Sequence, residues 1–248
     1  AALAAVPPDR LRLRTQVERA LSIACHRLAV LDDALAWGVR AAESARAAGD
    51  EALLADALLS AGVARSNAGD VQGGLACFLE ALQVHEAAGR TRACASVLNN
   101  IGINCKNLGR HEEAVAHLRR AEALLLADGG DAGALAMART NLAEPLWRLG
   151  RLDEAQALLE QALQALDGRV YAGFECHARY LLGQVLRARG ERDAGQAELE
   201  RALHTAAAQG RLDIQARIHL ALCELHRDAG RFEDALRQHE AFHAADRR

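Results

Sequence analysis

The sequence predicts an all-α protein made of six repeated helical hairpins, and three observations predict it. Alanine and leucine, both strong helix formers, supply 56 and 39 of the 248 residues. Aromatic residues, which strands favour, make up only 3%. Glycine recurs in fixed places every 40 or 41 residues, and a period of this length is typical of repeat proteins.

Glycine first marks the turn inside each hairpin. The turn residues are Gly69, Gly109, Gly150, Gly190 and Gly230, and Ala29 takes the same place in the first unit. We expect each glycine to end the first helix in a left-handed conformation. Acidic residues such as Glu112 and Glu113 then open the second helix, where they complement the helix dipole.

Glycine also closes the second helix of each hairpin, so both helices have expected bounds. These closing residues are Gly49, Gly89, Gly129, Gly168 and Gly210. First helices are expected near 15–28, 51–67, 91–107, 132–148, 171–188 and 211–228. Second helices are expected near 31–48, 71–88, 111–127, 152–166, 193–208 and 231–246. The sequence therefore predicts an N-terminal extension over 1–14 and a single repeat domain over 15–248.

Small residues recur where the two helices of a hairpin must approach closely. On the first helix they are Ser22, Gly62, Gly102, Ala143, Gly183 and Cys223. Early in the second helix they are Ala34, Gly74, Ala114, Ala155, Gly195 and Ala235. Seven residues later come Ala41, Ala81, Ala121, Ala162 and Ala202, with Phe242 in the last unit. Larger residues are expected to fill the remaining space, as Phe78, Leu118, Leu159 and Leu199 do four residues after the second set.

This pattern resembles the tetratricopeptide repeat, a 34-residue helical hairpin with small residues at places 8, 20 and 27 and glycine at place 15. The units here start near 15, 55, 95, 136, 176 and 216. The period here is 40 residues, which is longer than in the family. The family also carries a large apolar residue at place 4, and here only two units do, with Leu58 and Leu98. The other units carry Glu18, Arg139, Arg179 and His219 there. The resemblance implies a right-handed α-solenoid.

Composition and charge exclude other classes. A hydrophobic fraction of 51% excludes a disordered polar chain, and no apolar run is long enough to span a membrane. A net charge of −3 argues against a dedicated nucleic-acid binder. Residues 1–9 do not resemble a secretion signal, and the six cysteines read as small packing residues in a reducing compartment. We expect a cytoplasmic protein.

No catalytic motif is present. The sequence lacks the phosphate-binding loop, the nucleophile elbow and the zinc-protease motif. His219, Cys223 and His226 share one helix face with spacing that suits metal ligands, and His239 and His243 lie one turn apart on the partner helix. His219, Cys223 and His226 occupy places 4, 8 and 11 of the repeat, which normally pack against neighbouring helices, so we expect no metal. Because no catalytic motif is present, we also expect no cofactor and no enzymatic activity.

The resemblance implies that the first helices line a concave groove and that certain places point into it. The candidate ligand-binding residues are Asn67, Asn100, Lys106, Asn107, Asn141, Trp147, Arg148, Tyr180, Gln184 and Arg187. Asn100 and Asn141 occupy the same place in successive units, and amides that both donate and accept can hold a peptide backbone. The basic residues suit an acidic segment or a C-terminal carboxylate. Alternatively, these are simply solvated groove residues.

The sequence is compatible with three functions. The first is a protein- or peptide-binding scaffold, the sensor or adaptor region of a bacterial signalling protein, because residues 230–243 resemble the last repeat of such arrays. The second is a self-assembly module that dimerises through its end units, with Phe232 or Phe242 at the contact. The third is the regulatory part of a transcriptional activator whose output domain lies outside the chain. In none of them does this segment bind nucleic acid or membrane directly.

The two ends of the sequence leave one question open. It begins with alanine rather than methionine, and no polar capping helix follows the sixth unit. A repeat array without a cap exposes an apolar face. We therefore expect either that more chain follows or that the last unit packs against another copy.

Overall fold

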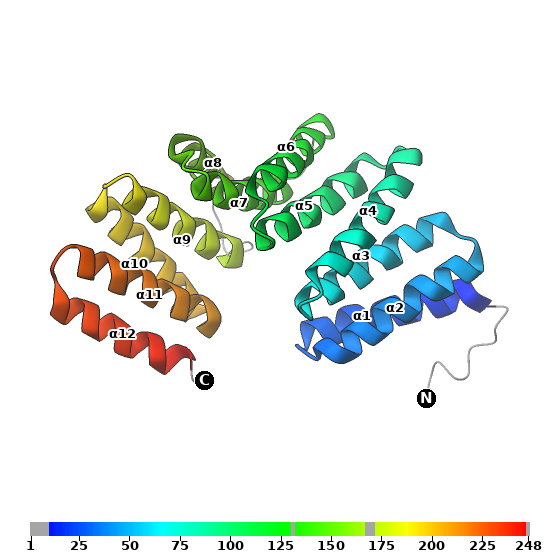
Figure 1. Ribbon diagram of the computed structural model, residues 1–248, viewed down its shortest axis with the longest axis horizontal. Coiled ribbons are helices and arrows are strands. Elements are labelled where there is room, and N and C mark those ends of the chain that lie inside the picture. Colours follow the sequence, from blue (N-terminus) through cyan, green and yellow to red (C-terminus); the bar gives the residue numbers. More distant parts are fainter. Residues whose placement is uncertain (1–9, 130–131, 167–171, 247–248) are drawn as a thin grey trace. The chain divides into compact units, whose positions relative to one another are not determined.

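The computed structural model describes residues 10–129, 132–166 and 172–246, and these ranges contain twelve helices and no strand (Figure 1). The helices are α1 (Leu11–Arg27), α2 (Leu31–Ala48), α3 (Glu51–Asn67), α4 (Val71–Ala87), α5 (Thr91–Asn107), α6 (His111–Ala127), α7 (Ala132–Arg148), α8 (Leu152–Ala165), α9 (Ala172–Ala188), α10 (Arg192–Ala208), α11 (Leu212–Asp228) and α12 (Phe232–Asp246). The all-α prediction of six helix-turn-helix repeats is confirmed. None of the described helices is long and apolar enough to span a membrane.

The predicted bounds agree with the helices to within one or two residues, except at the first helix. α1 begins at Leu11, four residues before the expected start at 15. Its extra turn carries good helix formers, and Thr15 bonds back to the carbonyl of Leu11 at 2.9 Å. The expected helix end at Gly168 lies outside the described residues.

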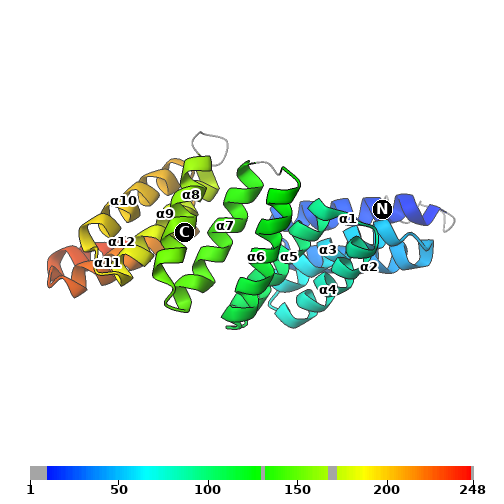
Figure 2. The ribbon, with the colours of Figure 1, turned by 90° about the horizontal axis from the view of Figure 1, so that it is seen from above.

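The contacts group the chain into two compact units, residues 1–129 and 130–248. In the N-terminal unit, α1–α2, α3–α4 and α5–α6 form three hairpins, each packed on the next. In the C-terminal unit, α7–α8, α9–α10 and α11–α12 do the same. Figure 2 shows the hairpins of each unit from a second direction. The expected continuity of one solenoid over 15–248 stays a prediction.

The turn inside each hairpin adopts the predicted left-handed conformation. Gly69 has φ +92°, and the N–H of the next residue, Asp70, closes the turn on the carbonyl of Arg65 at 2.9 Å. Ala29 occupies the same turn in the first hairpin with φ +58°. A left-handed alanine lowers the stability by about 1 kcal/mol relative to glycine. The first hairpin therefore forms the same turn with a strained residue.

The small residues lie where the hairpin helices cross, as predicted. A methyl group added at Gly62 would lie 2.5 Å from Cε1 of Phe78, and one at Gly74 would lie 2.8 Å from the carbonyl oxygen of Gly62. We call the position nine residues after the turn residue the filling place, because its side chain fills this crossing. It holds Phe78, Leu118, Leu159 and Leu199, all fully buried.

The polar residues at place 4 are compensated by partners on the second helix of the same hairpin. Glu18 is fully buried and accepts a 2.6 Å hydrogen bond from the Ser44 hydroxyl. Arg179 pairs with Glu198 at 2.9 Å. His219 lies 2.7 Å from the amide oxygen of Gln238. Each pair replaces the apolar contact made elsewhere by Leu58 or Leu98, since a buried polar group needs a partner.

All six cysteines are free, and they behave as packing residues. Cys94, Cys105 and Cys176 are buried, and the other three are half-buried. The Cys176 thiol donates to the carbonyl of Ala202 at 3.2 Å. Burial raises the pKa of this thiol to about 11, so it stays protonated and unreactive at neutral pH.

Candidate functional site

The ten predicted groove residues all lie on first helices of hairpins, but they divide between the two units. The N-terminal unit carries Asn67 on α3 and Asn100, Lys106 and Asn107 on α5. The C-terminal unit carries Asn141, Trp147 and Arg148 on α7 and Tyr180, Gln184 and Arg187 on α9. Asn100 and Asn141 belong to different units, so the amide ladder that joins them stays a prediction.

The N-terminal set is rich in amides that make local hydrogen bonds. Asn67 is exposed, and its amide nitrogen lies 3.3 Å from Nδ1 of His26 on α1. Asn100 donates to the carbonyl of Ser96 in its own helix at 3.0 Å. Asn107 is exposed, and Lys106 is half-buried. A ligand that binds this surface would have to replace these local hydrogen bonds with its own.

A further asparagine in this unit is structural. Asn104 is buried, and its amide donates to the Ser66 hydroxyl at 2.8 Å and to the carbonyl of Val71 at 3.1 Å. It therefore ties α5 to the preceding hairpin. Residue type alone does not separate it from Asn100 or Asn107, but its repeat place does, because place 10 is not among those expected to face the groove.

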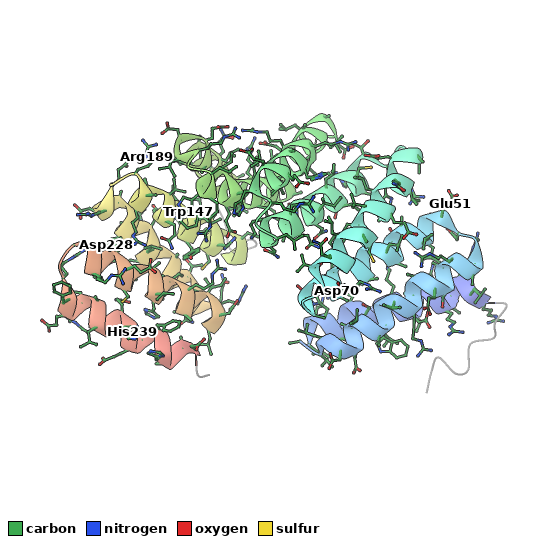
Figure 3. The ribbon with its side chains drawn as sticks, viewed as in Figure 1. Glu51, Asp70, Trp147, Arg189, Asp228 and His239 are labelled. Carbon is green, nitrogen blue, oxygen red and sulfur yellow. The ribbon has the colours of Figure 1, made fainter. Side chains whose placement is uncertain are left out.

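The C-terminal unit contains a pocket of about 380 Å³ that brings three predicted residues together. We call it the Trp147 pocket. Its walls are Trp147, Gln184, Arg187, Ala188, Gly190, Arg192, Leu225 and Asp228. They come from the C-terminal ends of α7, α9 and α11 and from the first residue of α10. Figure 3 labels Trp147 and Asp228 in this unit.

Arg187 in the pocket wall is already paired. Its Nη1 lies 2.6 Å from the carboxylate of Glu224, and its Nη2 lies 2.7 Å from that of Asp228. The hydrogen bond from Arg187 lowers the pKa of Asp228 below its usual value. The guanidinium thus joins α9 to α11, and its charge is balanced within the unit. The sequence analysis did not anticipate that Arg187 would pair with these two acids.

Two other arginines lie at the pocket, Arg192 in its wall and Arg148 next to Trp147. Arg148 places its guanidinium carbon 4.3 Å from the centre of the Trp147 ring, a cation–π contact. Arg192 stands exposed at the rim. Among the described residues, neither forms a direct ion pair. Among the residues that line the pocket, Arg187 and Arg192 stand against the single carboxylate of Asp228, so the pocket walls carry one net positive charge.

Arg192 was missed by sequence reasoning. It lies at the start of α10, a second helix, whereas the expected groove places are all on first helices. The sequence signal that could have indicated it is its closeness to the turn, since Arg192 follows the turn residue Gly190 by two residues. In the structure, both residues line the pocket.

Tyr180 lies outside the walls of the Trp147 pocket and is only 9% exposed. Gln184 donates to its hydroxyl at 3.3 Å, and the guanidinium of Arg217 lies 4.9 Å from the ring centre. His177 stacks beside it with ring centres 6.3 Å apart. These contacts hold Tyr180 within the unit, and its role as a ligand anchor stays a prediction.

The suspected three-residue metal face is engaged in packing. His219 bonds to Gln238, and His226 is buried. Within the described ranges, no group of three or more His, Cys, Asp or Glu side chains is arranged to hold a metal ion.

A family model described as tetratricopeptide repeat matches residues 53–127 and 95–167. No curated protein matches the sequence. Among solved structures, the chain is similar to BtubC from P. vanneervenii, with TM-score 0.72 and 18% identity over 87% of this chain and 91% of that one. It is also similar to the apo form of RapI, with TM-score 0.81 and 13% identity over 99% of this chain and 87% of that one.

A third similar structure is a Rap protein complexed with Competence and Sporulation Factor, with TM-score 0.68 and 15% identity over 91% of this chain and 73% of that one. At these identities, the likenesses establish a shared fold. They agree with the arrangement of helical hairpins described above.

Proposed function

Because the chain is a tetratricopeptide-repeat protein, we propose that it is a non-catalytic scaffold that binds a protein or peptide partner on the first helices of its hairpins. The observation that carries this proposal is the Trp147 pocket, where an aromatic wall, an amide and free arginine charge converge. Pockets that combine apolar walls with a few polar groups are the usual binding sites of proteins. Buried aromatic and arginine contacts commonly dominate binding energy.

The partner group that suits this pocket is a carboxylate next to an apolar side chain. Arg192 in the wall and Arg148 beside it supply positive charge, and Trp147 supplies apolar surface. Arg187 and Arg192 outweigh Asp228 among the wall residues, and this net positive charge disfavours a cationic group because like charges repel. An acidic segment or a free C-terminal carboxylate fits this arrangement best.

A regulatory role in bacteria is the finer form of the proposal. The likeness to Rap structures and the resemblance of residues 230–243 to the last repeat of bacterial signalling arrays support a cytoplasmic sensor or adaptor. The partner bound at the pocket would then control an output that lies on an attached or separate domain. The regulatory part of a transcriptional activator is one form of this role.

The test is a selection of displayed random peptides, followed by affinity measurement on the synthetic winners. Each winner is made with a free C-terminal carboxylate and as the C-terminal amide. We expect Arg192→Ala and Trp147→Ala each to weaken binding by about tenfold or more. Removal of the peptide's acidic group should have a similar effect.

The matched control is Arg46→Ala, which removes an exposed arginine that pairs with Glu80 in the N-terminal unit. It should leave the affinity within about twofold. Winners that bind Arg192→Ala and Trp147→Ala as tightly as the unaltered chain would refute the pocket as the binding site.

Self-assembly is the second candidate function, and one observation favours it. Phe232 and Leu236 on α12 are 70% and 58% exposed and lie one helical turn apart. Apolar side chains gathered on a surface often mark a contact with another chain. Analytical ultracentrifugation of the unaltered chain and of Phe232→Ser tests it. A dimer that Phe232→Ser dissociates supports assembly, and a monomer at all concentrations contradicts it.

A further inference from the structure

Two histidines on the last helix point their ring nitrogens at each other. His239 and His243 lie one turn apart on α12, and both are exposed. Their Nε2 atoms are 3.1 Å apart, and their ring centres are 4.5 Å apart in an edge-on arrangement. Figure 3 shows His239 on this helix. The pair lies apart from the Trp147 pocket, whose walls include no residue of α12.

His239 is exposed although the repeat pattern puts it at a packing place. It occupies the filling place of the sixth hairpin, nine residues after Gly230. The same place holds Phe78, Leu118, Leu159 and Leu199 in the second to fifth hairpins and Gly38 in the first, and all of these are buried within their units. A polar, exposed imidazole here departs from a position that is otherwise apolar and closed.

The distance between the two nitrogens suits a shared metal ion. Zinc–histidine bonds are about 2.0–2.1 Å long, so two nitrogens on a tetrahedral ion lie roughly 3.3–3.4 Å apart and two on adjacent square-planar positions lie about 2.9 Å apart. At 3.1 Å, one imidazole N–H donates to the other ring nitrogen, and this separation falls between the two values, so an ion would take the place of the shared proton. Side chains at i and i+4 meet on one face of a helix, so the backbone already sets this spacing.

The rings are also held in place before any ion arrives. Phe242 stacks on His239 with ring centres 6.2 Å apart, and its ring centre lies 5.0 Å from that of His243. Ligands that are fixed in their binding geometry lose less freedom on binding. Phe242 therefore acts as a positioning residue for the two imidazoles.

We propose that His239 and His243 form a chelating site for a divalent transition metal of intermediate softness, Zn²⁺, Cu²⁺ or Ni²⁺. Imidazole nitrogen suits these ions, whereas Mg²⁺ and Ca²⁺ require oxygen ligands. The two histidines supply two coordination positions, and water fills the others. The site is therefore exchangeable and responds to the concentration of free metal.

Isothermal titration of the full chain, free of any affinity tag, with ZnCl₂ and with CuSO₄ tests this proposal. We expect one ion per chain, and His239→Ala and His243→Ala should each weaken the binding by about tenfold or more. Titration with MgCl₂ should give no heat of binding. Phe242→Leu keeps both ligands and should weaken binding by a smaller factor, because only the positioning contact is lost.

The matched control is His204→Ala, which removes an exposed histidine on α10. It should leave the affinity within about twofold. Electron paramagnetic resonance of the Cu²⁺ complex should show coupling to two nitrogens, reduced to one in His243→Ala. Absence of zinc and copper binding, or binding that survives loss of both histidines, would overturn the proposal. Circular dichroism checks that each variant is folded.

Discussion

The two units of the chain share one packing frame and differ in the surface they present on their first helices. In both, small residues let the hairpin helices cross and a large apolar residue fills the crossing, as at Phe78 and Leu199. The N-terminal unit presents amides such as Asn67 and Asn107. The C-terminal unit presents the Trp147 pocket with its arginines. Packing fixes the repeat places, and the remaining places are free to carry recognition.

The largest expected effect tests the shared frame. Phe78→Ala in the N-terminal unit should lower the free energy of unfolding by about 3–5 kcal/mol, and Leu199→Ala in the C-terminal unit by about 2–5 kcal/mol, because each opens a cavity. His239→Ala at the same place should change it by less than about 0.5 kcal/mol, because that side chain is exposed. Urea denaturation followed by circular dichroism measures all three. Equal losses would show that the last hairpin packs like the others.

The next effect is the dependence of stability on pH, and each unit has a buried histidine that contributes to it. His85 and His226 are 1% and 5% exposed, and within the described part of the chain Nδ1 of each has no hydrogen-bond partner. Burial lowers the pKa of both rings, and the nearby charges of Arg90 and Arg231 lower it further. The folded chain therefore disfavours protonation of His85 in the N-terminal unit and of His226 in the C-terminal unit.

The sign of the pH effect follows from these lowered pKa values. As pH falls below about 6.5, the unfolded chain takes up protons before the folded chain does. Above that pH, the two histidines do not reduce the free energy of unfolding. Between that pH and the lower folded-state pKa, the free energy of unfolding falls by up to about 1.4 kcal/mol per pH unit for each histidine. Urea midpoints at pH 7.5 and 5.5 measure this loss. His85→Gln and His226→Gln should each reduce it, and an unchanged loss in both variants would contradict the assignment.

The smallest effect separates the first hairpin from the others. Ala29 has a left-handed backbone where the later hairpins have glycine. Ala29→Gly should raise the free energy of unfolding by up to about 1 kcal/mol, and Gly69→Ala should lower it by a similar amount. Thermal denaturation of the two variants compares them. If Gly69→Ala raised the free energy of unfolding, the claim that the left-handed turn disfavours alanine would be contradicted.

The frame could be predicted from the sequence because it repeats. A single small residue such as Gly62 says little, but the same type every 40 residues marks a crossing, and the structure has the crossing there. The turn at Ala29 was also found through the period and not through its residue type. The start of α1 was missed because no repeat place lies before residue 15 to mark it.

The candidate site was harder to predict because its chemistry depends on neighbours from other repeats. Trp147, Gln184 and Arg187 were expected on one surface, and in the structure they line one pocket. The pairing of Arg187 with Glu224 and Asp228 joins residues about 40 positions apart, and no local pattern predicts it. The burial of Tyr180 likewise involves Arg217 in the next hairpin.

The central claim is that a partner binds at the Trp147 pocket, and tryptophan fluorescence tests it most directly. The chain has two tryptophans, and Trp37 lies on α2 in the N-terminal unit. Trp37→Phe therefore leaves Trp147 as the sole indole reporter. Titration with an acidic peptide from the display selection should shift its emission in a saturable way, with the affinity found by calorimetry. Peptide binding by calorimetry without any change in Trp147 emission would contradict the claim.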